Sequence, residues 1–289
     1  MTPVINTQFI ADVGWRRYVW RLARRQLAKR VLRTGNRLRL STGLIMDLPA
    51  ASPTASEVFI TGGNIDWGSE ALLMRHLDSS GCFFDVGANI GYYALLAAPL
   101  VARVLAFEPD PRNWPALEAN AGRAGNVELV RKAVWREGGR MALDIGGNSG
   151  ISFLRPDGGG DMTLETEVIT LDSFAAGLGG RPVTGIKIDV EGFDLDVLHG
   201  ARRLLHDDQP LVLTEFTLGD GRTNDADALF ALASDAGYAL YAFVRAPAGG
   251  TARFALRRIS RQYFDSAALK MLFLVPERLQ PCFAAEAGQ

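Results

Sequence analysis

Seven residues in the first third of the chain, 85–91, join an acidic side chain to two glycines. They begin at the end of an apolar run, 82–86. In an open α/β sheet, ligands bind where such a strand ends, because the backbone amides that begin the next helix point at them. Glycine permits positive φ and a close approach of a ligand to the backbone. The pattern therefore predicts a nucleotide-like ligand, held by Asp85, Gly87, Ala88, Asn89 and Gly91.

A second acid follows the next apolar run, 103–107. Glu108 lies roughly 20 residues beyond the first turn, where a carboxylate can accept hydrogen bonds from both hydroxyls of a ribose. Pro109 ends this strand, since proline cannot continue the ladder. An adenine ring commonly lies against apolar backbone after the third strand, so Ala133 and Val134 complete the predicted cofactor-binding set.

The acids and the glycine spacing together indicate the kind of cofactor. Asp85 would repel a pyrophosphate, and Gly-x-x-x-Gly differs from the G-x-G-x-x-G fingerprint of nicotinamide-binding folds. A cofactor that carries an ammonium and a sulfonium suits an acidic edge, so we predict S-adenosyl-L-methionine. A nicotinamide dehydrogenase is the alternative enzyme class. A non-catalytic protein that binds S-adenosylmethionine, as a sensor or scaffold, is the non-enzymatic alternative.

Charged residues also lie at the ends of the fourth and fifth apolar runs. Lys187 and Asp189 share one face of a predicted strand at 185–190, and Glu215 closes the run 211–215. Charged side chains at the end of a central strand are costly unless they are paired or functional. We predict Asp189 as the general base, Glu215 as the second choice and Lys187 as the cation that orients them. An ion-pair network that only fixes loops is the structural alternative.

Apolar runs that alternate with helix-like segments must position these residues. Alternation of this kind is typical of an α/β fold, with a mostly parallel sheet covered by helices on both faces. A Gly-rich insertion at about 138–170 contains three short strands, 141–145, 151–154 and 168–171. The seven runs expected in the main sheet are 82–86, 103–107, 127–130, 185–190, 211–215, 239–244 and 270–275.

The charge of the chain is unevenly distributed. The first 40 residues carry ten Lys/Arg and one acid, which leaves 21 basic and 31 acidic residues for the remainder. We therefore expect a basic head at 1–68, a domain at 69–280 and a tail at 281–289. An acidic body argues against a nucleic-acid partner. The stretch 15–32 predicts a basic amphipathic helix, which either contacts a membrane surface or packs on its own domain. We expect 37–68 to lack regular structure, apart from short extended pieces such as 58–60.

The cellular location is predicted from what the sequence does not contain. No apolar run approaches the roughly 18 residues that a spanning helix needs, and we identify no signal peptide at the start. Two cysteines are too few for a disulfide framework. We expect a cytoplasmic protein, with a peripheral membrane contact through the basic head as an option. Its oligomeric state is not readable from the sequence.

Four segments together resemble the FkbM family of S-adenosylmethionine-dependent methyltransferases. They are DVGANIGYYALLAA, LAFEPDPRNWPALEAN, VITLDSF and IKIDVEGFDLDVLHGA, and the resemblance covers about 69–275. It implies a class I, Rossmann-like methyltransferase fold whose last strand, 271–275, is antiparallel. It also implies O-methylation of a hydroxyl on a glycan, polyketide or other small natural product.

Two features of the reaction stay open at this point. In a metal-assisted variant of the catechol type, Asp189 and Glu215 would hold a Mg²⁺ that acidifies the acceptor hydroxyl, and we favour this variant less. The acceptor itself has no readable code. We expect the residues that shape its site to come from the head, the insertion and 219–222.

Overall fold

The computed structural model of the chain describes residue 10 and residues 13–146, 152–155, 162–216, 225–245, 254–264 and 269–288. The stretch 219–222, expected to shape the acceptor site, lies outside the described residues, as do two parts of the insertion. No helix among the described residues is long and apolar enough to cross a membrane.

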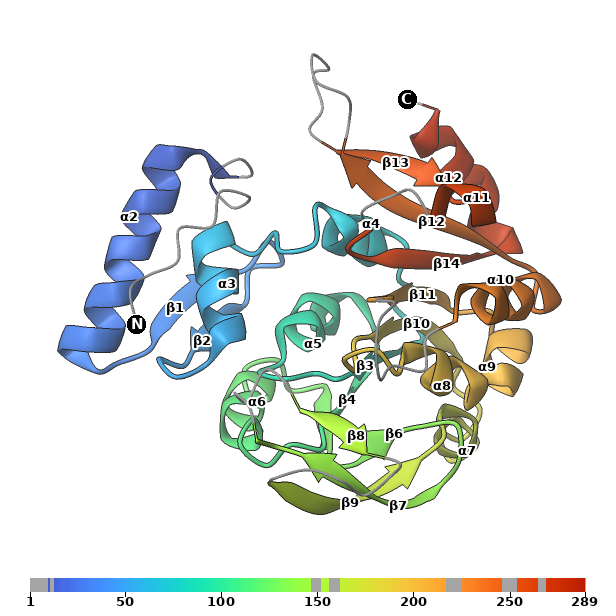
Figure 1. Ribbon diagram of the computed structural model, residues 1–289, viewed down its shortest axis with the longest axis horizontal. Helices are drawn as coiled ribbons and strands as arrows, with labels where there is room; N and C mark the ends of the chain where they lie inside the picture. Colours follow the sequence, from blue (N-terminus) through green and yellow to red (C-terminus); the bar gives the residue numbers. More distant parts are fainter. Residues whose placement is uncertain are drawn as a thin grey trace.

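An eight-stranded sheet forms the centre of the molecule (Figure 1). Five neighbouring strands are parallel, and β14 pairs antiparallel with β11 on one side and with β12 on the other. The order is β13-β12-β14-β11-β10-β3-β4-β5. The strands are β3 (Cys82–Val86), β4 (Arg103–Phe107), β5 (Val127–Val130), β10 (Val183–Ile188), β11 (Leu211–Thr214), β12 (Tyr238–Arg245), β13 (Phe254–Arg258) and β14 (Leu272–Pro276).

This sheet confirms the predicted α/β fold and the antiparallel last strand. All residues of β3, β10 and β11 are buried, which explains why they read as continuous apolar runs rather than as alternating ones. The predicted number of strands was wrong by one, because β13 adds an eighth at the edge. Its sequence, FALRR, ends in two exposed arginines, as is common for an edge strand, and lacks a clear apolar pattern.

Helices cover both faces of the sheet and enclose two hydrophobic cores. One core lies under α4 (Ser69–Arg75), α5 (Tyr92–Ala97), α6 (Trp114–Ala121) and α12 (Gln280–Ala287). The other lies under α7 (Leu171–Ala175), α8 (Asp194–His199), α9 (Arg202–Asp207), α10 (Ala226–Asp235) and α11 (Arg261–Phe264). Two 3₁₀ turns, η2 (Ala98–Leu100) and η3 (Glu277–Leu279), complete the set. Residues 281–287, expected in a tail, lie in α12, whose Phe283 is fully buried.

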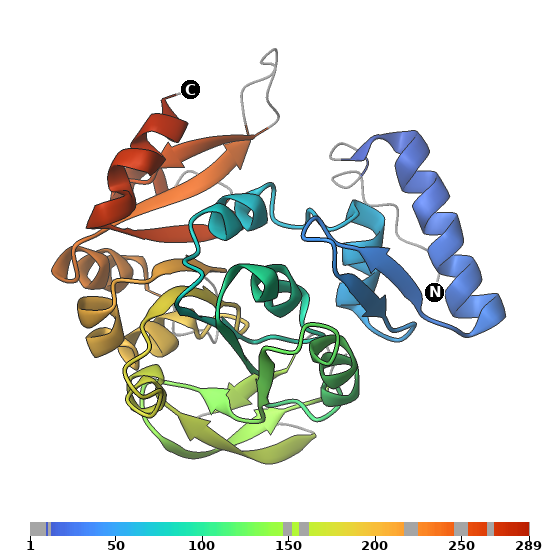
Figure 2. The same ribbon diagram turned by 180° about the vertical axis from the view of Figure 1, so that it is seen from behind.

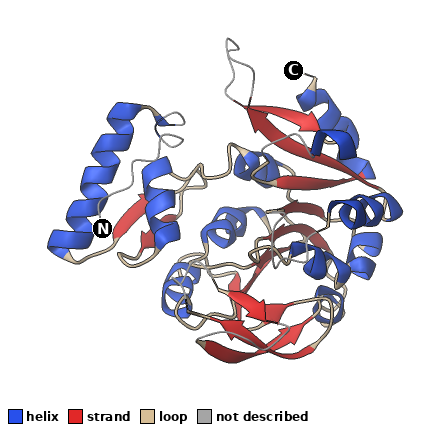
Figure 3. Cartoon of the chain, in the orientation of Figure 1, coloured by secondary structure: helices blue, strands red, loops and turns tan. Residues whose placement is uncertain are grey.

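The predicted insertion forms a second, smaller sheet beneath the first, as Figure 3 shows. Its order is β6-β9-β7-β8, and β7 pairs antiparallel with both β8 and β9. The strands are β6 (Ala133–Val134), β7 (Gly139–Asp144), β8 (Phe153–Arg155) and β9 (Thr163–Ile169). The expected strands 141–145 and 151–154 overlap β7 and β8. The third, 168–171, was misplaced, because β9 runs from Thr163 to Ile169 and Leu171 begins α7.

The basic head stands beside the main sheet (Figure 2). The predicted helix is confirmed as α2 (Trp15–Gln26), which continues as a π-helical segment, η1 (Leu27–Leu32). It packs on a hairpin of β1 (Asn36–Arg39) and β2 (Ile45–Leu48) and on α3 (Pro53–Thr61). Arg25 is fully buried in this packing, and its guanidinium donates to the carbonyl oxygens of Leu48 and Pro49 at 3.0 and 2.6 Å.

The expectation that 37–68 lacks regular structure was wrong. The run 58–60, predicted as an extended piece, lies in α3. Local capping explains the helix: the side chain of Ser52 accepts a hydrogen bond from the backbone N–H of Ala55, and Pro53 occupies the first turn. Gly62, with φ of 75°, ends it in the left-handed conformation.

Candidate active site

The glycine turn lies between β3 and α5, at the carboxyl ends of the parallel strands. Gly87 has φ of 75°, and a Cβ at this position would lie 2.0 Å from the carbonyl oxygen of Asp189. Gly91 has φ of 86°, and its Cβ would lie 2.7 Å from the side chain of Leu117. Glycine is therefore required at both positions for two reasons: the backbone is left-handed, and a side chain would collide with a neighbouring residue.

Asp85 ends β3 beneath this turn and is buried. Its Oδ2 accepts a hydrogen bond from the backbone N–H of Ala94 at 2.8 Å. Its Oδ1 is buried and makes no hydrogen bond to any described residue. Burial raises the pKa of Asp85 to about 6, although the charge of Lys187 opposes this effect. A buried carboxylate oxygen of this kind is ready to accept a donor from a ligand.

Glu108 directly follows β4, next to the turn, and is also buried. Its Oε2 accepts from the backbone N–H of Asn89 at 2.7 Å, and its Oε1 accepts from that of Asp110 at 2.9 Å. Burial raises the pKa of Glu108 to about 7, against the effect of these two donors and of the side chain of Asn113. Asn89 has a left-handed backbone, with φ of 51°, and in this conformation its N–H donates to the carboxylate of Glu108.

A cavity of about 400 Å³ opens over these residues. Its wall combines the ends of the central strands with α3 of the head and with β7 and β8 of the small sheet. The cavity collects eleven of the twelve residues predicted for the site: Asp85, Gly87, Ala88, Asn89, Glu108, Pro109, Ala133, Val134, Lys187, Asp189 and Glu215. Gly91 is the exception: it does not line the cavity, and it lies close to the side chain of Leu117.

The predicted catalytic residues lie together beside the turn, at the ends of β10 and β11. Lys187 is buried, and its Nζ lies 3.1 Å from Oδ2 of Asp189 and donates to the carbonyl oxygen of Gly87 at 3.3 Å. Burial alone would lower the pKa of Lys187, but the carboxylates of Asp189 and Asp85 outweigh it and raise that pKa. Lys187 is therefore a charged residue, as the prediction of an orienting cation requires.

Asp189 and Glu215 share a hydrogen bond, and the pKa values of their two carboxyl groups shift in opposite directions. Burial and the negative charge of Asp189 raise the pKa of Glu215 to about 9. Burial would raise the pKa of Asp189 as well, but Lys187 and the hydrogen bond from Glu215 lower it. Near neutral pH the pair therefore carries one proton, on Glu215, and Asp189 is ionised.

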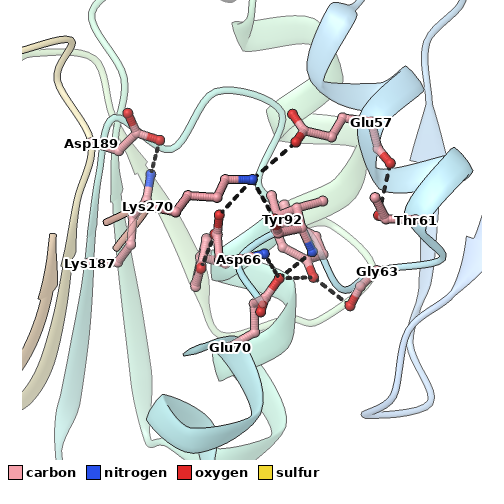
Figure 4. Close-up of polar contacts among 11 residues, drawn as sticks. Glu57, Thr61, Gly63, Asp66, Glu70, Tyr92, Lys187, Asp189 and Lys270 are labelled. Atoms are coloured by element: carbon pink, nitrogen blue, oxygen red, sulfur yellow. Dashed lines mark hydrogen bonds and ion pairs between the residues drawn. The ribbon is translucent and has the colours of Figure 1, made fainter. Parts of the chain in front are cut away.

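A third group of polar residues lines the cavity and was not predicted from the sequence (Figure 4). Nζ of Lys270 lies 3.2 Å from Oε1 of Glu57 on α3 and 3.2 Å from Oδ1 of Asp66. The hydroxyl of Tyr93 donates to Oδ2 of Asp66 at 2.5 Å. These carboxylates outweigh the effect of burial and raise the pKa of Lys270.

A buried carboxylate anchors this group from below. Oε1 of Glu70 accepts from the backbone N–H groups of Ile65 and Asp66 at 2.6 and 2.8 Å, and from the hydroxyl of Tyr92 at 3.3 Å. Burial and the charge of Asp66 raise the pKa of Glu70 to about 7. The contacts fix the connection between α3 and α4, so that the head forms one wall of the cavity (Figure 4).

Comparison with known proteins now places this geometry in a family. The model of the methyltransferase FkbM domain matches residues 85–240, which include the turn, Glu108 and the Lys187 group. The chain belongs to the FkbM methyltransferase family. This confirms the resemblance seen in the sequence.

Similar proteins extend over parts of the chain. The hexuronic acid methyltransferase AglP of Haloferax volcanii is 30% identical over 135 residues, which are 46% of this chain and 55% of the relative. The chain thus spans about half the length of this curated relative. A crystal structure of methyltransferase FkbM from Methylobacillus flagellatus is 18% identical, with a TM-score of 0.46, over 76% of this chain and 52% of the other. An rRNA methylase from Streptococcus thermophilus is 13% identical, with a TM-score of 0.42, over 72% and 95%.

Proposed function

We propose that the protein is an S-adenosylmethionine-dependent O-methyltransferase that acts on a hydroxyl of a sugar-type acceptor. The observation that carries the proposal is the shared cavity, which joins the acidic glycine turn and Glu108 to the group Lys187, Asp189 and Glu215. Membership of the FkbM methyltransferase family supports the reaction type. The relative named as a hexuronic acid methyltransferase supports the acceptor class.

The residues of the turn fit the proposed cofactor. The buried Oδ1 of Asp85, which makes no hydrogen bond to a described residue, suits the ammonium group of S-adenosylmethionine. Glu108 suits a ribose hydroxyl, because two backbone N–H groups and the side chain of Asn113 use three of the roughly four lone-pair positions of its carboxylate. Ala133 and Val134 offer an apolar surface to the adenine. When bound, S-adenosylmethionine supplies a methyl group on a positively charged sulfur.

Asp189 is the base in this proposal. An acceptor hydroxyl would give its proton to a carboxylate oxygen of Asp189 as its oxygen takes the methyl group. The electron pair of the broken S–CH₃ bond would stay on the sulfur, which would leave as a neutral thioether. Lys187 holds this carboxylate at 3.1 Å and keeps it ionised. Glu215 keeps its own proton and donates it in a hydrogen bond to Asp189. A positioned base of this kind contributes on the order of 10²–10⁴ in rate.

The acceptor would occupy the half of the cavity that lies against the head. On this wall the ammonium group of Lys270 pairs with two carboxylates, those of Glu57 and Asp66 (Figure 4). A wall of a few fixed polar groups suits a hydroxyl-rich molecule, because it offers both donors and acceptors at set positions. The wall therefore supports a sugar over an apolar polyketide.

The test is methyl transfer from [methyl-³H]S-adenosylmethionine to methyl glycosides of neutral hexoses and of hexuronic acids. We expect labelled product that survives mild alkali, since an ether is stable to alkali and an ester is not. Asp189→Asn should abolish most of this transfer, and Asp207→Asn, which changes an exposed carboxylate on α9, should not. A product that mild alkali hydrolyses would overturn the hydroxyl acceptor, and no transfer to any sugar would overturn the acceptor class.

Metal dependence stays a prediction and is tested in the same assay with EDTA and with added Mg²⁺. The described residues contain no group of three or more His, Cys, Asp and Glu side chains arranged to hold a metal ion. We also propose a cytoplasmic location. The two cysteines, Cys82 and Cys282, are unpaired, which a reducing compartment favours.

A further inference from the structure

The helix of the basic head exposes an unusual amount of apolar surface. Ten large hydrophobic side chains are exposed among the described residues, and six of them lie on α2 and η1. The most exposed are Val31, at 69%, and Trp15, at 65%. The other four are Val19, Trp20, Leu27 and Leu32, each exposed by half or more. Single exposed hydrophobics are ordinary, but a cluster of this size marks an interaction surface.

The same helix is firmly packed on its other side. Tyr18, Arg25 and Ala28 are buried against the head. Arg25 donates to Oδ1 of Asn36 at 3.0 Å and to Oγ of Ser56 at 3.1 Å, besides its two carbonyl contacts. The exposed apolar side chains therefore belong to a docked helix, which lies at the outer edge of the molecule (Figures 1 and 2).

The charge along this part of the chain has a single sign. From residue 13 to residue 46 the chain has ten Lys/Arg and no Asp or Glu. Arg16, Arg17, Arg24, Arg30 and Arg33 are exposed. The guanidinium of Arg24 lies 4.6 Å from the ring centroid of Trp20, so basic and aromatic groups share one surface.

We propose that α2 and η1 bind the surface of a membrane that contains anionic lipids, with the helix lying in the interface. Tryptophan rings prefer the headgroup level, and long basic side chains can bury their stems while their charged ends reach lipid phosphates. An exposed apolar stripe alone would suit many partners. The exposed arginines, in a stretch without one acid, select an anionic surface.

The experiment is flotation of the full-length chain with vesicles of phosphatidylcholine, alone or with about 30% phosphatidylglycerol. The wild type should float with the anionic vesicles, only weakly with the neutral ones, and less as salt is raised. The triple variant Trp20→Ser, Leu27→Ser, Val31→Ser should bind at least tenfold more weakly. A control with Met162→Ser and Tyr263→Ser, which removes two exposed hydrophobics elsewhere, should bind as the wild type does.

Thermal unfolding checks that all three proteins are folded. A second variant, Arg16→Gln, Arg24→Gln, Arg30→Gln, should lose the preference for anionic vesicles and keep the fold. The proposal is overturned if the folded wild type does not float with anionic vesicles, or if the serine variant floats equally well. It is also overturned if the wild type binds no vesicles but dimerises, and the serine variant is monomeric, because the face would then be a contact between two copies.

Discussion

Glu108→Gln tests the cofactor half of the cavity and does not require the acceptor to be known. Each oxygen of Glu108 accepts one backbone N–H, from Asn89 at 2.7 Å and from Asp110 at 2.9 Å. Glutamine offers one oxygen and one NH₂ group, so one of the two backbone donors would face another donor. The same change removes the negative charge that the ribose hydroxyls would meet.

The size of the effect follows from hydrogen bonds to a charged group, which are worth about 1.5–3 kcal/mol each. At about 1.4 kcal/mol per tenfold change, the loss of one such bond weakens binding by roughly 10–150-fold. We therefore expect the Kd for S-adenosylhomocysteine, measured by isothermal titration calorimetry, to rise by this factor. Glu128→Gln removes an exposed carboxylate that pairs with Arg103, and we expect it to leave the Kd unchanged.

The pH dependence gives a second readout. The pKa of Glu108 is about 7, above the ordinary value, so part of the free protein carries a proton there at neutral pH. Hydroxyl donors bind the ionised form, and affinity should therefore rise with pH, by about tenfold between pH 6 and pH 8. Glu108→Gln should remove this part of the dependence. A folded Glu108→Gln protein with the wild-type Kd and pH profile would refute the assigned role.

Three further changes probe the rest of the site. Asp189→Asn should lower methyl transfer by about 10²–10⁴ and change the Kd for S-adenosylhomocysteine by less than about threefold; weak binding instead would place Asp189 in the cofactor site. Gly87→Ala should abolish that binding and lower the Tm, because the new Cβ would meet the carbonyl oxygen of Asp189. The control Gly179→Ala should show only the strain of a left-handed backbone, about 1–2 kcal/mol, because Gly179 has φ of 67° and open space around it. Glu215 keeps its proton up to a pKa of about 9, so wild-type stability should fall as pH rises from 5 to 9. Glu215→Gln should flatten this fall by up to about 1.4 kcal/mol per pH unit in denaturant titrations, and an unchanged slope would contradict the raised pKa.

The glycine turn to which we assign the cofactor could be predicted as a structure because its signals are local. Residues 82–86 are buried on both faces and therefore read as one apolar run, and Gly87 must adopt a backbone that other residues resist. Glu108 ends the neighbouring strand of the sheet. Apolar runs and glycine turns, both visible in the sequence, are thus sufficient to bring these residues to one edge of the sheet.

The polar wall formed by Glu57, Asp66 and Lys270 could not be predicted in the same way, because its contacts join distant parts of the chain. Lys270 pairs with Glu57 and Asp66, which precede it by more than 200 residues. No periodic pattern relates such positions. Each residue by itself reads as an ordinary charged residue on a surface.

The errors in the head have a related cause. Three apolar residues at 58–60 fit a strand and a helix equally well. The caps that decide for a helix, Ser52 and Gly62, are visible in the sequence, but Pro53 and Gly62 fit breaks in a loop just as well. The hairpin of β1 and β2 is short, and β1 is largely polar, so it lacks the alternation by which strands are predicted.

The most direct test of the central claim is calorimetric titration of the protein with S-adenosylhomocysteine and, separately, with NAD⁺. The acidic turn with Glu108 predicts saturable binding of S-adenosylhomocysteine at one site per chain, which S-adenosylmethionine displaces, and no binding of NAD⁺. Tight binding of NAD⁺ without binding of S-adenosylhomocysteine would contradict it.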